Sequence, residues 1–519
     1  MILDKTMKTN KCEWYKNAII YEIYPASFTT EGLQGVIKKL DYIKKLGVQA
    51  IWLCPIFKSP FMDSGYDTQD YYKVNEKFGS MSNLEELIDK AHERELKVIL
   101  DIALNHTSNE HEWFVDACKS KESKYRDYYI FRDANDEEYP NNWISSKTLK
   151  PTWTYNEKTE DYYLHIYTKY QPDLNWRNEK VRNEIYDILE FWILKGIDGF
   201  RLDVINKIAK PQVIEESESK EKYADYLYEN NQDSHLFIKE MRKKVFDKYD
   251  DILMLGQTSG INVEQGIAYG SSKNKELDIF LQFDHMDLIT KNNAKLQKAI
   301  MIWQNIDNED AWPTMFMGSH DSSRMVNHFA TSDEKYRDIA AKMLCALQLC
   351  LKGTQIIYMG DELAVSNVRN SHIEEFIDIR SKDIYNVRMK AGVGEKQIVN
   401  ELNNTTRDNA RRQMPWERAC DMLNDEDSVL AFYKKVISWR KQEDAILHGK
   451  TICLFEGDKN IFAYKRAYKD SEIMLFANIS AKDVQLDDRS YGQKMISNYK
   501  KCTPNILLPF QVKIYKKQV

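Results

Sequence analysis

Four features are absent from this 519-residue sequence, and each absence argues against a class of protein. No apolar run is long enough to span a bilayer, and the first twenty residues lack the apolar core of a secretion signal. We therefore expect a cytoplasmic protein that has no membrane partner. The net formal charge is −6 rather than strongly positive, which argues against a nucleic-acid partner. Internal repeats and low-complexity linkers are also missing.

The fourth absence is that of a closely paired cysteine motif. Eight cysteines are present, and none belongs to a CxxC pair. Their wide spacing fits reduced, mostly buried thiols better than a disulfide framework or a zinc site. They are Cys12, Cys54, Cys118, Cys345, Cys350, Cys420, Cys453 and Cys502.

The composition is that of an ordinary soluble protein, with 43% hydrophobic and 30% charged residues. A chain of this length predicts one large domain plus one or two smaller units. Eight short apolar segments predict β-strands, and helical patterns lie between most of them, as at residues 33–46. The predicted strands cover residues 18–24, 50–53, 98–104, 199–202, 252–255, 278–283, 314–318 and 355–358. Eight strands alternating with helices make a closed (β/α)8 TIM barrel the simplest interpretation of this α/β pattern.

The last part of the chain has a different pattern. Short alternating segments at 451–455, 461–464 and 473–477 are separated by turn residues, which predicts an antiparallel β domain over residues 448–519. Residues 429–440 predict the final barrel helix. Before that helix, the polar stretch 359–416 lacks regular periodicity and predicts a functional loop or lid.

Polar side chains gather at the predicted carboxyl ends of three strands. Arg201 and Asp203 are two residues apart, so they lie on one face of a strand and the arginine can orient the carboxylate. A buried ion pair that only holds a loop would look the same. Similar clusters follow two other strands, at residues 101–106 and at His320-Asp321, and this recurrence favours the active site of a barrel enzyme.

These clusters resemble the signature regions of the α-amylase family, glycoside hydrolase family 13. The resemblance covers nearly the whole chain and is carried by Asp101 with Asn105-His106, by residues 199–205 and by His320-Asp321. Residues 171–175 (QPDLN) and 407–411 (RDNAR) are similar to the oligo-1,6-glucosidase branch. That branch also includes trehalose-6-phosphate hydrolases, sucrose isomerases and α-glucosidases.

The resemblance implies a domain arrangement and a pocket. The barrel would comprise residues 1–106 and 173–447, and residues 107–172 would form a subdomain, inserted after the third strand, that walls one side of the pocket. Tyr66 would stack under the terminal sugar and Asp63, with Arg411 as its best-matched partner, would grip the outermost hydroxyls. Such a grip makes an enzyme act from the non-reducing end. Tyr167 stands where relatives usually have a sugar-facing phenylalanine.

The resemblance also implies a retaining mechanism and several site residues. Asp203 would be the nucleophile, and Arg201 would keep it ionised by an opposite charge at close range. Asp321 would orient the ring hydroxyls, while His106 and His320 would donate hydrogen bonds that strengthen in the transition state. No cofactor is expected. The loop at residues 27–32 has too few carboxylates for the calcium site of relatives, so we predict no metal there.

The acid/base position departs from the family pattern. The family has its catalytic glutamate directly after the fifth strand, where this chain has Gln257. An amide can hydrogen-bond the glycosidic oxygen but cannot deliver a proton, and Glu264 and Glu276 lie too far along the chain to substitute. Two explanations remain open. The chain is a glutamate-to-glutamine variant made to hold substrate intact, or it is a native sugar-binding relative that has lost hydrolytic power.

Val204, directly after the nucleophile, resembles members that act on α-1,6 bonds, although trehalose-6-phosphate hydrolases share it. A sucrose isomerase is disfavoured because the motif Arg-Leu-Asp-Arg-Asp is missing. We therefore expect a retaining, exo-acting α-glucosidase for short α-1,6-linked oligosaccharides or disaccharides such as isomaltose, inactivated by Gln257. The alternatives are hydrolysis of trehalose 6-phosphate, sucrose or isomaltulose, glucosyl transfer on the same scaffold, or a catalytically silent sugar binder.

Overall fold

Eight parallel strands form the central sheet of the computed structural model, which describes residues 13–133, 139–288, 291–486, 491–501, 503 and 505–519. Along the sheet their order is β11-β10-β9-β5-β2-β1-β13-β12. The two end strands lie side by side, where Thr314 Oγ1 donates to the Phe280 carbonyl at 2.7 Å, so the sheet nearly closes into a barrel. The strands are β1 (Ile19–Ile23), β2 (Ala50–Leu53), β5 (Lys97–Ala103), β9 (Gly199–Asp203), β10 (Leu253–Gln257), β11 (Ile279–Leu281), β12 (Thr314–Phe316) and β13 (Thr354–Tyr358).

A helix follows each barrel strand along the described chain. These helices are α2 (Gly32–Leu46), α3 (Met81–His92), α5 (Glu179–Leu194), α7 (Gln232–Lys244), α8 (Val263–Gly270), α9 (Asn293–Met301), α10 (Arg337–Leu349) and α14 (Val429–Arg440). Nearly every strand residue is buried, because both faces of the sheet are covered by side chains of the barrel interior or the helices. The predicted TIM barrel is confirmed, and residues 33–46 and 429–440 are helical as expected.

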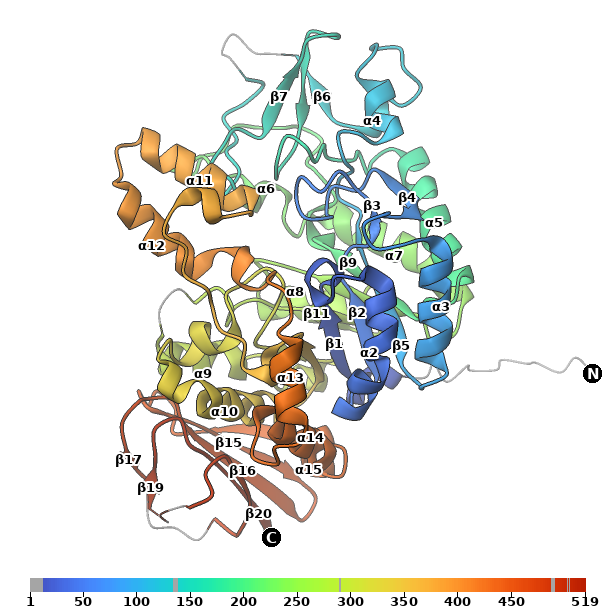
Figure 1. Cartoon of the computed structure of the whole chain (residues 1–519). Coiled ribbons are helices and arrows are strands. Elements are labelled where there is room, and N and C mark those ends of the chain that lie inside the picture. The colour runs from blue at the N-terminus through green and yellow to red at the C-terminus, as the bar shows by residue number, and fades with distance from the viewer. Residues whose placement is uncertain (1–12, 134–138, 289–290, 487–490, 502, 504) are drawn as a thin grey trace, which may run out of the picture.

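The chain between β5 and α5 leaves the barrel and forms a small antiparallel sheet of order β6-β8-β7. It lies at the top of Figure 1, and its elements are α4 (Glu112–Ala117), β6 (Phe131–Arg132), β7 (Trp153–Asn156) and β8 (Asp161–Leu164). Its apolar residues pack against the segment after β9: Trp143 contacts Tyr228 and its indole donates to the Glu215 carbonyl at 2.7 Å. Most of the aromatic residues here are therefore core. The exact limits 107 and 172 stay a prediction.

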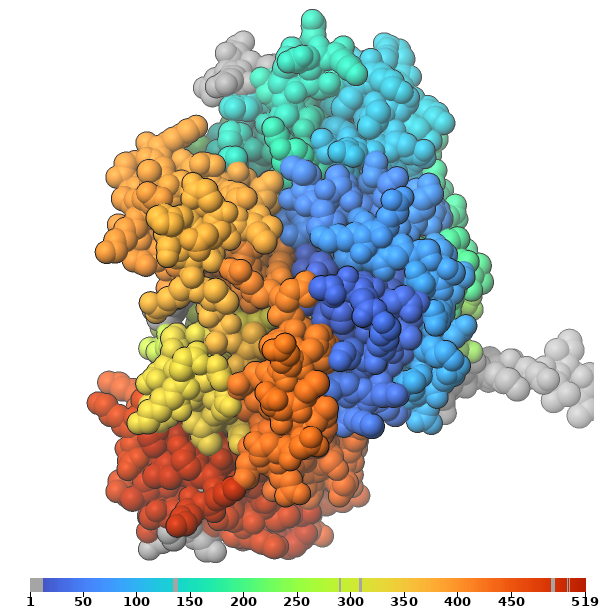
Figure 2. Space-filling model, in the orientation of Figure 1, coloured from blue at the N-terminus to red at the C-terminus, as the bar shows by residue number. Residues whose placement is uncertain are grey.

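The stretch 359–416 is not irregular, so the sequence-based expectation was wrong on that point. It contains α11 (Ile379–Lys390) and α12 (Glu395–Thr405), which pack around a core of Phe376, Ile398 and Leu402. This core consists of four buried apolar side chains with four partly buried ones packed against them, and its small size explains why the sequence pattern is weak. Figure 2 shows the pair beside the inserted sheet, and Lys150 forms an ion pair with Asp383 across the junction. Between this pair and α14 lies α13 (Trp416–Leu423).

The C-terminal part is a five-stranded antiparallel sheet of order β14-β15-β16-β20-β18, at the bottom of Figure 1. Its strands are β14 (Lys450–Leu454), β15 (Ile461–Tyr468), β16 (Ser471–Asn478), β18 (Gln493–Ser497) and β20 (Val512–Gln518), with β17 (Val484–Gln485) and β19 (Ile506–Leu507) forming a separate pair. The sheet packs on α10, where the Tyr464 hydroxyl donates to the Leu347 carbonyl at 2.8 Å. The predicted antiparallel β domain is confirmed.

Six of the eight cysteines are described, and all six are free thiols. Cys54, Cys345 and Cys350 are buried, whereas Cys420 is exposed. Two cysteines, Cys12 and Cys502, lie outside the described residues. The same holds for residues 1–12, which belong to the segment considered as a secretion signal. No helix in the described ranges combines the length and the hydropathy needed to cross a membrane.

Candidate active site

Arg201 connects the carboxyl ends of three neighbouring barrel strands. Its Nη1 donates to Asp203 Oδ1 at 2.6 Å and to Asp101 Oδ1 at 2.8 Å, and its Nη2 donates to the Gln257 side-chain oxygen. Arg201 is only 1% exposed, so these bonds replace the water that a guanidinium would otherwise bind. One buried cation therefore fixes the positions of the predicted nucleophile and of the residue at the predicted acid/base position.

A cavity of about 190 Å³ opens at this end of the barrel. Eight of the eleven predicted site residues line it: Asp63, Tyr66, His106, Tyr167, Asp203, Val204, Gln257 and Asp321. The other three do not line the cavity but bind residues that do. Arg201 binds Asp203, and His320 and Arg411 both bind Asp321. The predicted site residues are thus brought together, and their individual roles stay predictions.

Asp63 is buried, and its partner differs from the predicted one. Its Oδ1 accepts from Arg407 Nη2 at 2.6 Å, whereas Arg411 pairs with Asp321 at 2.9 Å and donates to the His320 carbonyl. Arg407 begins a short 3-10 segment, Arg407–Asn409, and Arg411 follows about one turn later. The sequence therefore did not reveal which of the two arginines faces Asp63. Burial alone would raise the pKa of Asp63, but Arg407, Arg380 and Arg411 together hold it below its ordinary value.

Asp101 and Tyr66 both lie next to Arg201. The Tyr66 hydroxyl donates to Asp101 Oδ2 at 2.9 Å and lies 2.6 Å from His320 Nε2, and its ring stacks on the His320 ring at 5.4 Å. Burial raises the pKa of Asp101 to about 6, against the opposing charge of Arg201. Tyr66 is therefore held rigidly by polar contacts at its tip, while part of it faces the cavity.

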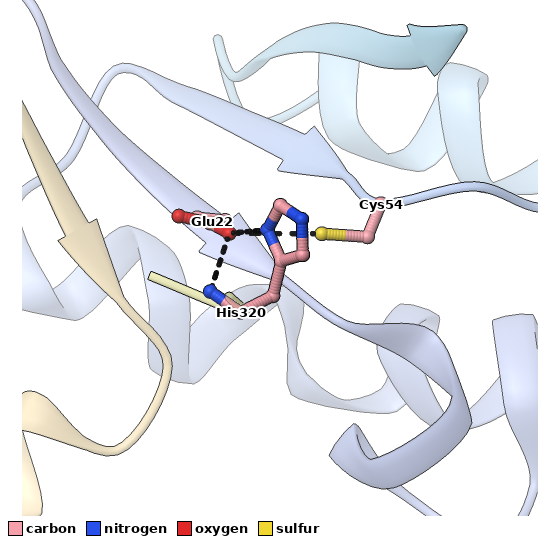
Figure 3. Close-up of side chains that lie close together, drawn as sticks. All are labelled: Glu22, Cys54 and His320. Atoms are coloured by element: carbon pink, nitrogen blue, oxygen red, sulfur yellow. Dashed lines mark hydrogen bonds and ion pairs between the residues drawn. The ribbon is translucent and has the colours of Figure 1, made fainter. Parts of the chain in front are cut away.

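His320 is anchored from behind by Glu22, as Figure 3 shows. Its Nδ1 lies 2.5 Å from Glu22 Oε1, and its Nε2 lies 3.2 Å from Asp321 Oδ2. Burial opposes protonation, but the charge of Asp321 raises the pKa of His320 well above its usual range. Burial likewise opposes ionisation of Asp321, yet His320 and Arg411 lower its pKa well below its ordinary value. The charged forms of His320 and Asp321 therefore stabilise each other.

Two clusters in this region have the donor types of cation sites. Cys54 Sγ lies 3.7 Å from Glu22 Oε1, so Glu22, Cys54 and His320 gather one carboxylate, one thiol and one imidazole. Glu22 and His320 are already bonded to each other, which is the arrangement of an ion pair rather than of open metal ligands. The second cluster is filled by an ammonium: Lys210 Nζ donates to Asn105 Oδ1 at 2.6 Å and lies 3.2 Å from Asp173 Oδ2.

His106 is buried among polar groups. Its Nδ1 lies 3.1 Å from the Asn105 side-chain nitrogen, and its Nε2 lies 3.1 Å from the Tyr66 carbonyl. Burial lowers the pKa of His106, although the charges of Asp203 and Asp173 act in the opposite direction. Gln171 Nε2 lies 3.0 Å from the same imidazole and donates to Asp63, so it bridges two of the predicted sugar-binding residues.

Val204 has a left-handed backbone conformation, with φ 40° and ψ 41°. This conformation is unfavourable for a β-branched residue, and such strain is found mainly at functional sites. Here it accompanies the turn that ends β9 directly after Asp203, and the Val204 amide lies 3.4 Å from the Gln257 side-chain oxygen. The chain thus makes a sharp turn directly after Asp203.

Neither of the two glutamates considered from the sequence as a substitute acid lines the cavity. Glu276 is 1% exposed and pairs with His235 Nδ1 at 2.7 Å, away from the residues that line the cavity. Glu264 is in α8 and does not line the cavity either. Asp287 lines the cavity as well, and it is a carboxylate that was not predicted from the sequence to be part of the site.

Sequence reasoning also missed two cations of the cavity wall, Lys147 and Arg380. Lys147 comes from the inserted segment and Arg380 from α11, so both lie in regions without strong periodicity. Only the tertiary contacts bring them to the site. The remaining cavity residues outside the eleven predicted site residues are Gln171, Ser259, Phe283, Met286, Asp287, Ser319 and Ser322.

Comparison with known proteins agrees with this geometry. The family model described as "Alpha amylase, catalytic domain" matches residues 22–449. An oligo-1,6-glucosidase of Parageobacillus thermoglucosidasius is 36% identical over 557 aligned positions, covering 97% of this chain and 99% of that protein. A trehalose-6-phosphate hydrolase of Bacillus subtilis is also 36% identical, with 91% of each chain covered.

Solved structures give the same result for the fold. The trehalose-6-phosphate hydrolase of Bacillus licheniformis superposes with a TM-score of 0.89 at 35% identity, over 98% of this chain and 100% of that one. The isomaltulose synthase of Erwinia rhapontici superposes with a TM-score of 0.92 at 30% identity, over 97% and 99% of the two chains. Likeness to these structures therefore extends over essentially the full length.

Proposed function

Because this chain belongs to the α-amylase family, we propose that its cavity is the site of a retaining α-glucosidase for short α-glucosides, in which Gln257 occupies the acid/base position. One observation carries the proposal: Asp203 and Gln257 line the same cavity and are held by the same buried arginine. Retaining hydrolysis needs a nucleophile and an acid/base group close together at the scissile bond. Asp203 would serve as the nucleophile, and the amide of Gln257 stands where the acid/base group is expected.

Action from the non-reducing end is supported by the closed side of the cavity. Asp63 is 1% exposed and is fixed there by Arg407 and Gln171. A carboxylate in this position accepts hydrogen bonds from the outermost hydroxyls of a terminal glucose and leaves no room for further sugar units. The proposed ligand is therefore a disaccharide or short oligosaccharide that inserts its terminal glucose.

The preference for an α-1,6 linkage rests on Val204, which is 6% exposed and lines the cavity next to Gln257. A branched side chain here narrows the space beside the leaving group and favours the more flexible 1,6 bond. Trehalose 6-phosphate is the second candidate, because curated relatives with that activity are as similar to the chain as the oligo-1,6-glucosidases are.

The proposal is tested by the substitution Gln257→Glu. It should restore hydrolysis by roughly 10²–10⁴-fold, since that is the usual contribution of general acid catalysis. The assay is glucose release from isomaltose, trehalose 6-phosphate, sucrose, isomaltulose and maltose, with proton NMR to detect the anomer that forms first. Retention of configuration is expected.

Two controls make the result interpretable. The double variant Gln257→Glu/Asp203→Asn should be inactive, because it regains the acid but loses the nucleophile. Titration calorimetry of the unsubstituted protein with isomaltose measures binding without turnover. If Gln257→Glu releases no glucose from any of these α-glucosides while the unsubstituted protein still binds sugar, the chain is a sugar-binding relative and the enzyme proposal fails.

A further inference from the structure

A second cavity, of about 340 Å³, lies beside the catalytic one, and the two share only Tyr167. One side of it is formed by the inserted segment and the other by α11, and the ion pair of Lys150 with Asp383 joins these sides, which lie next to each other in Figure 2. Thr168, on its wall, donates to Gln171 of the catalytic cavity at 2.9 Å. A ligand in the second cavity therefore occupies a space separate from that of the proposed glucose.

Aromatic side chains make up much of the lining of this second cavity. They are Tyr139, Trp153, Tyr167 and Tyr170. The indole of Trp153 donates to Asn141 Oδ1 at 2.7 Å, so this ring is fixed in place. Tyr170 is half-buried, so part of its surface is open to a ligand. A flat apolar ring packs well against the C–H face of a sugar, and ligand cavities generally combine such walls with a few polar groups.

His165 supplies a polar group that lacks a partner. Its side chain is 4% exposed and lines the second cavity, and its Nε2 lies 2.8 Å from Thr154 Oγ1. Its buried Nδ1 has no hydrogen-bond partner within the described part of the chain. Burial lowers the pKa of His165 to about 3, although the Tyr167 backbone acts in the opposite direction. A neutral imidazole nitrogen can donate to or accept from a hydroxyl, and buried polar atoms are nearly always paired, so this nitrogen points to a ligand that carries hydroxyl groups.

The charged side chains around the second cavity leave it without a buried counter-ion. Lys150 is paired with Asp383, and Lys169 is exposed, with its ammonium 5.3 Å from the centre of the Tyr170 ring. Among the described residues, no other lysine, arginine, aspartate or glutamate lines the cavity. An ionic ligand would lose its water here without gaining a partner of opposite charge, which favours an uncharged ligand.

We propose that the second cavity binds a neutral sugar of one or two units, which packs on the aromatic rings and bonds a hydroxyl to His165 Nδ1. The catalytic cavity of about 190 Å³ is proposed to take one terminal glucose, and the second cavity is larger. Its lining contains no carboxylate besides the paired Asp383, so the sugar is held there without being cleaved. The inference goes beyond the proposed glucosidase activity, because neither Asp203 nor Gln257 takes part.

The number of sugars bound per chain is the first measurement. Isomaltose is the probe, and the unsubstituted protein is dialysed to equilibrium against the radiolabelled sugar over a range of concentrations. Two isomaltose molecules per chain are expected at saturation, one in each cavity.

Variants assign one of these molecules to the second cavity. Tyr170→Ala removes a ring, and His165→Phe keeps the bulk of the side chain but removes its nitrogen atoms. Each should weaken one binding event by roughly tenfold or more, the effect of losing one aromatic contact or one hydrogen bond, and leave the other unchanged. Because Tyr170 is half-buried, its replacement does not open the protein core. Tyr155→Ala is the matched control: Tyr155 belongs to the inserted sheet, is 47% exposed and lines neither cavity, so both binding events should stay as they are.

The inference is overturned if no bound isomaltose depends on Tyr170 and His165, that is, if both variants bind it in the same number and with the same affinity as Tyr155→Ala. Failure of the glucosidase proposal looks different. In that case Gln257→Glu releases no glucose, while Tyr170→Ala still weakens the binding of one isomaltose. If Gln257→Glu hydrolyses α-glucosides but Tyr170→Ala binds isomaltose like Tyr155→Ala, only the inference about the second cavity fails.

Discussion

Arg407→Met should destabilise the protein and weaken sugar binding, because one guanidinium neutralises two buried carboxylates. Its Nη2 donates to Asp63 Oδ1 at 2.6 Å and its Nε donates to Asp378 Oδ1 at 3.0 Å. The arginine and both acids have side chains that are at most 4% exposed. Removing one member of a buried ion pair usually costs about 3–5 kcal/mol, because the remaining charge is left without compensation.

The pH dependence of this effect has a definite sign. Burial opposes ionisation of Asp63 and Asp378, but Arg407 and its neighbours hold both folded-state pKa values below the ordinary value. The stability that these acids contribute is therefore present above about pH 4 and is lost as the pH falls through the folded-state values. The loss caused by Arg407→Met should be largest at neutral pH and should shrink as the pH falls toward about 4.

Thermal unfolding between pH 4 and 8 and calorimetric titration with isomaltose measure the two effects. Affinity for isomaltose should fall by roughly tenfold or more, since Asp63 loses the partner that orients it. Arg388→Met is the matched control: its partner Glu401 is on the surface of the same helical pair, so stability and binding should change little. If Arg407→Met unfolds and binds like Arg388→Met at neutral pH, the assignment of Arg407 as the anchor of Asp63 is refuted.

Two further predictions concern Lys210 and Val204. Lys210→Met leaves the buried Asp173 without its cation, so the unfolding free energy should fall by about 3–5 kcal/mol. Thermal or denaturant unfolding would measure this change. Unchanged stability would contradict the proposed role of the Lys210 ammonium. Val204→Gly, in the Gln257→Glu background, relieves the left-handed strain and widens the cavity, so the rate ratio of maltose to isomaltose hydrolysis should rise. A constant ratio would show that Val204 does not select the linkage.

The barrel could be predicted from the sequence because its strands are buried on both faces. Such strands are continuous apolar runs, and all eight are recognisable without tertiary information. The antiparallel domain at the C-terminal end is equally evident from alternation. By contrast, α11 and α12 were not recognised, because this pair buries few apolar side chains and most of its surface is polar.

The site residues also divide into those that the sequence could predict and those that it could not. Those directly after a strand, such as Asp203, Gln257 and Asp321, have positions that strand direction determines, because parallel strands all end at the same face of the barrel. The residues contributed by loops depend on how distant segments pack. Arg407 rather than Arg411 faces Asp63, and nothing in the local sequence distinguishes two arginines one turn apart.

By itself the sequence determined the fold class, the order of the strands along the chain and the residues at the strand ends, because the spacing of apolar residues is a local property. Tertiary structure decided which charges neutralise one another when the partners are far apart in the sequence. It paired Asp63 with Arg407 and Asp321 with Arg411, whereas the pairing of Arg201 with Asp203 followed from their spacing on one strand. The physical reason is that a charge pair between distant segments depends on distances of a few ångströms, and those distances are set by packing.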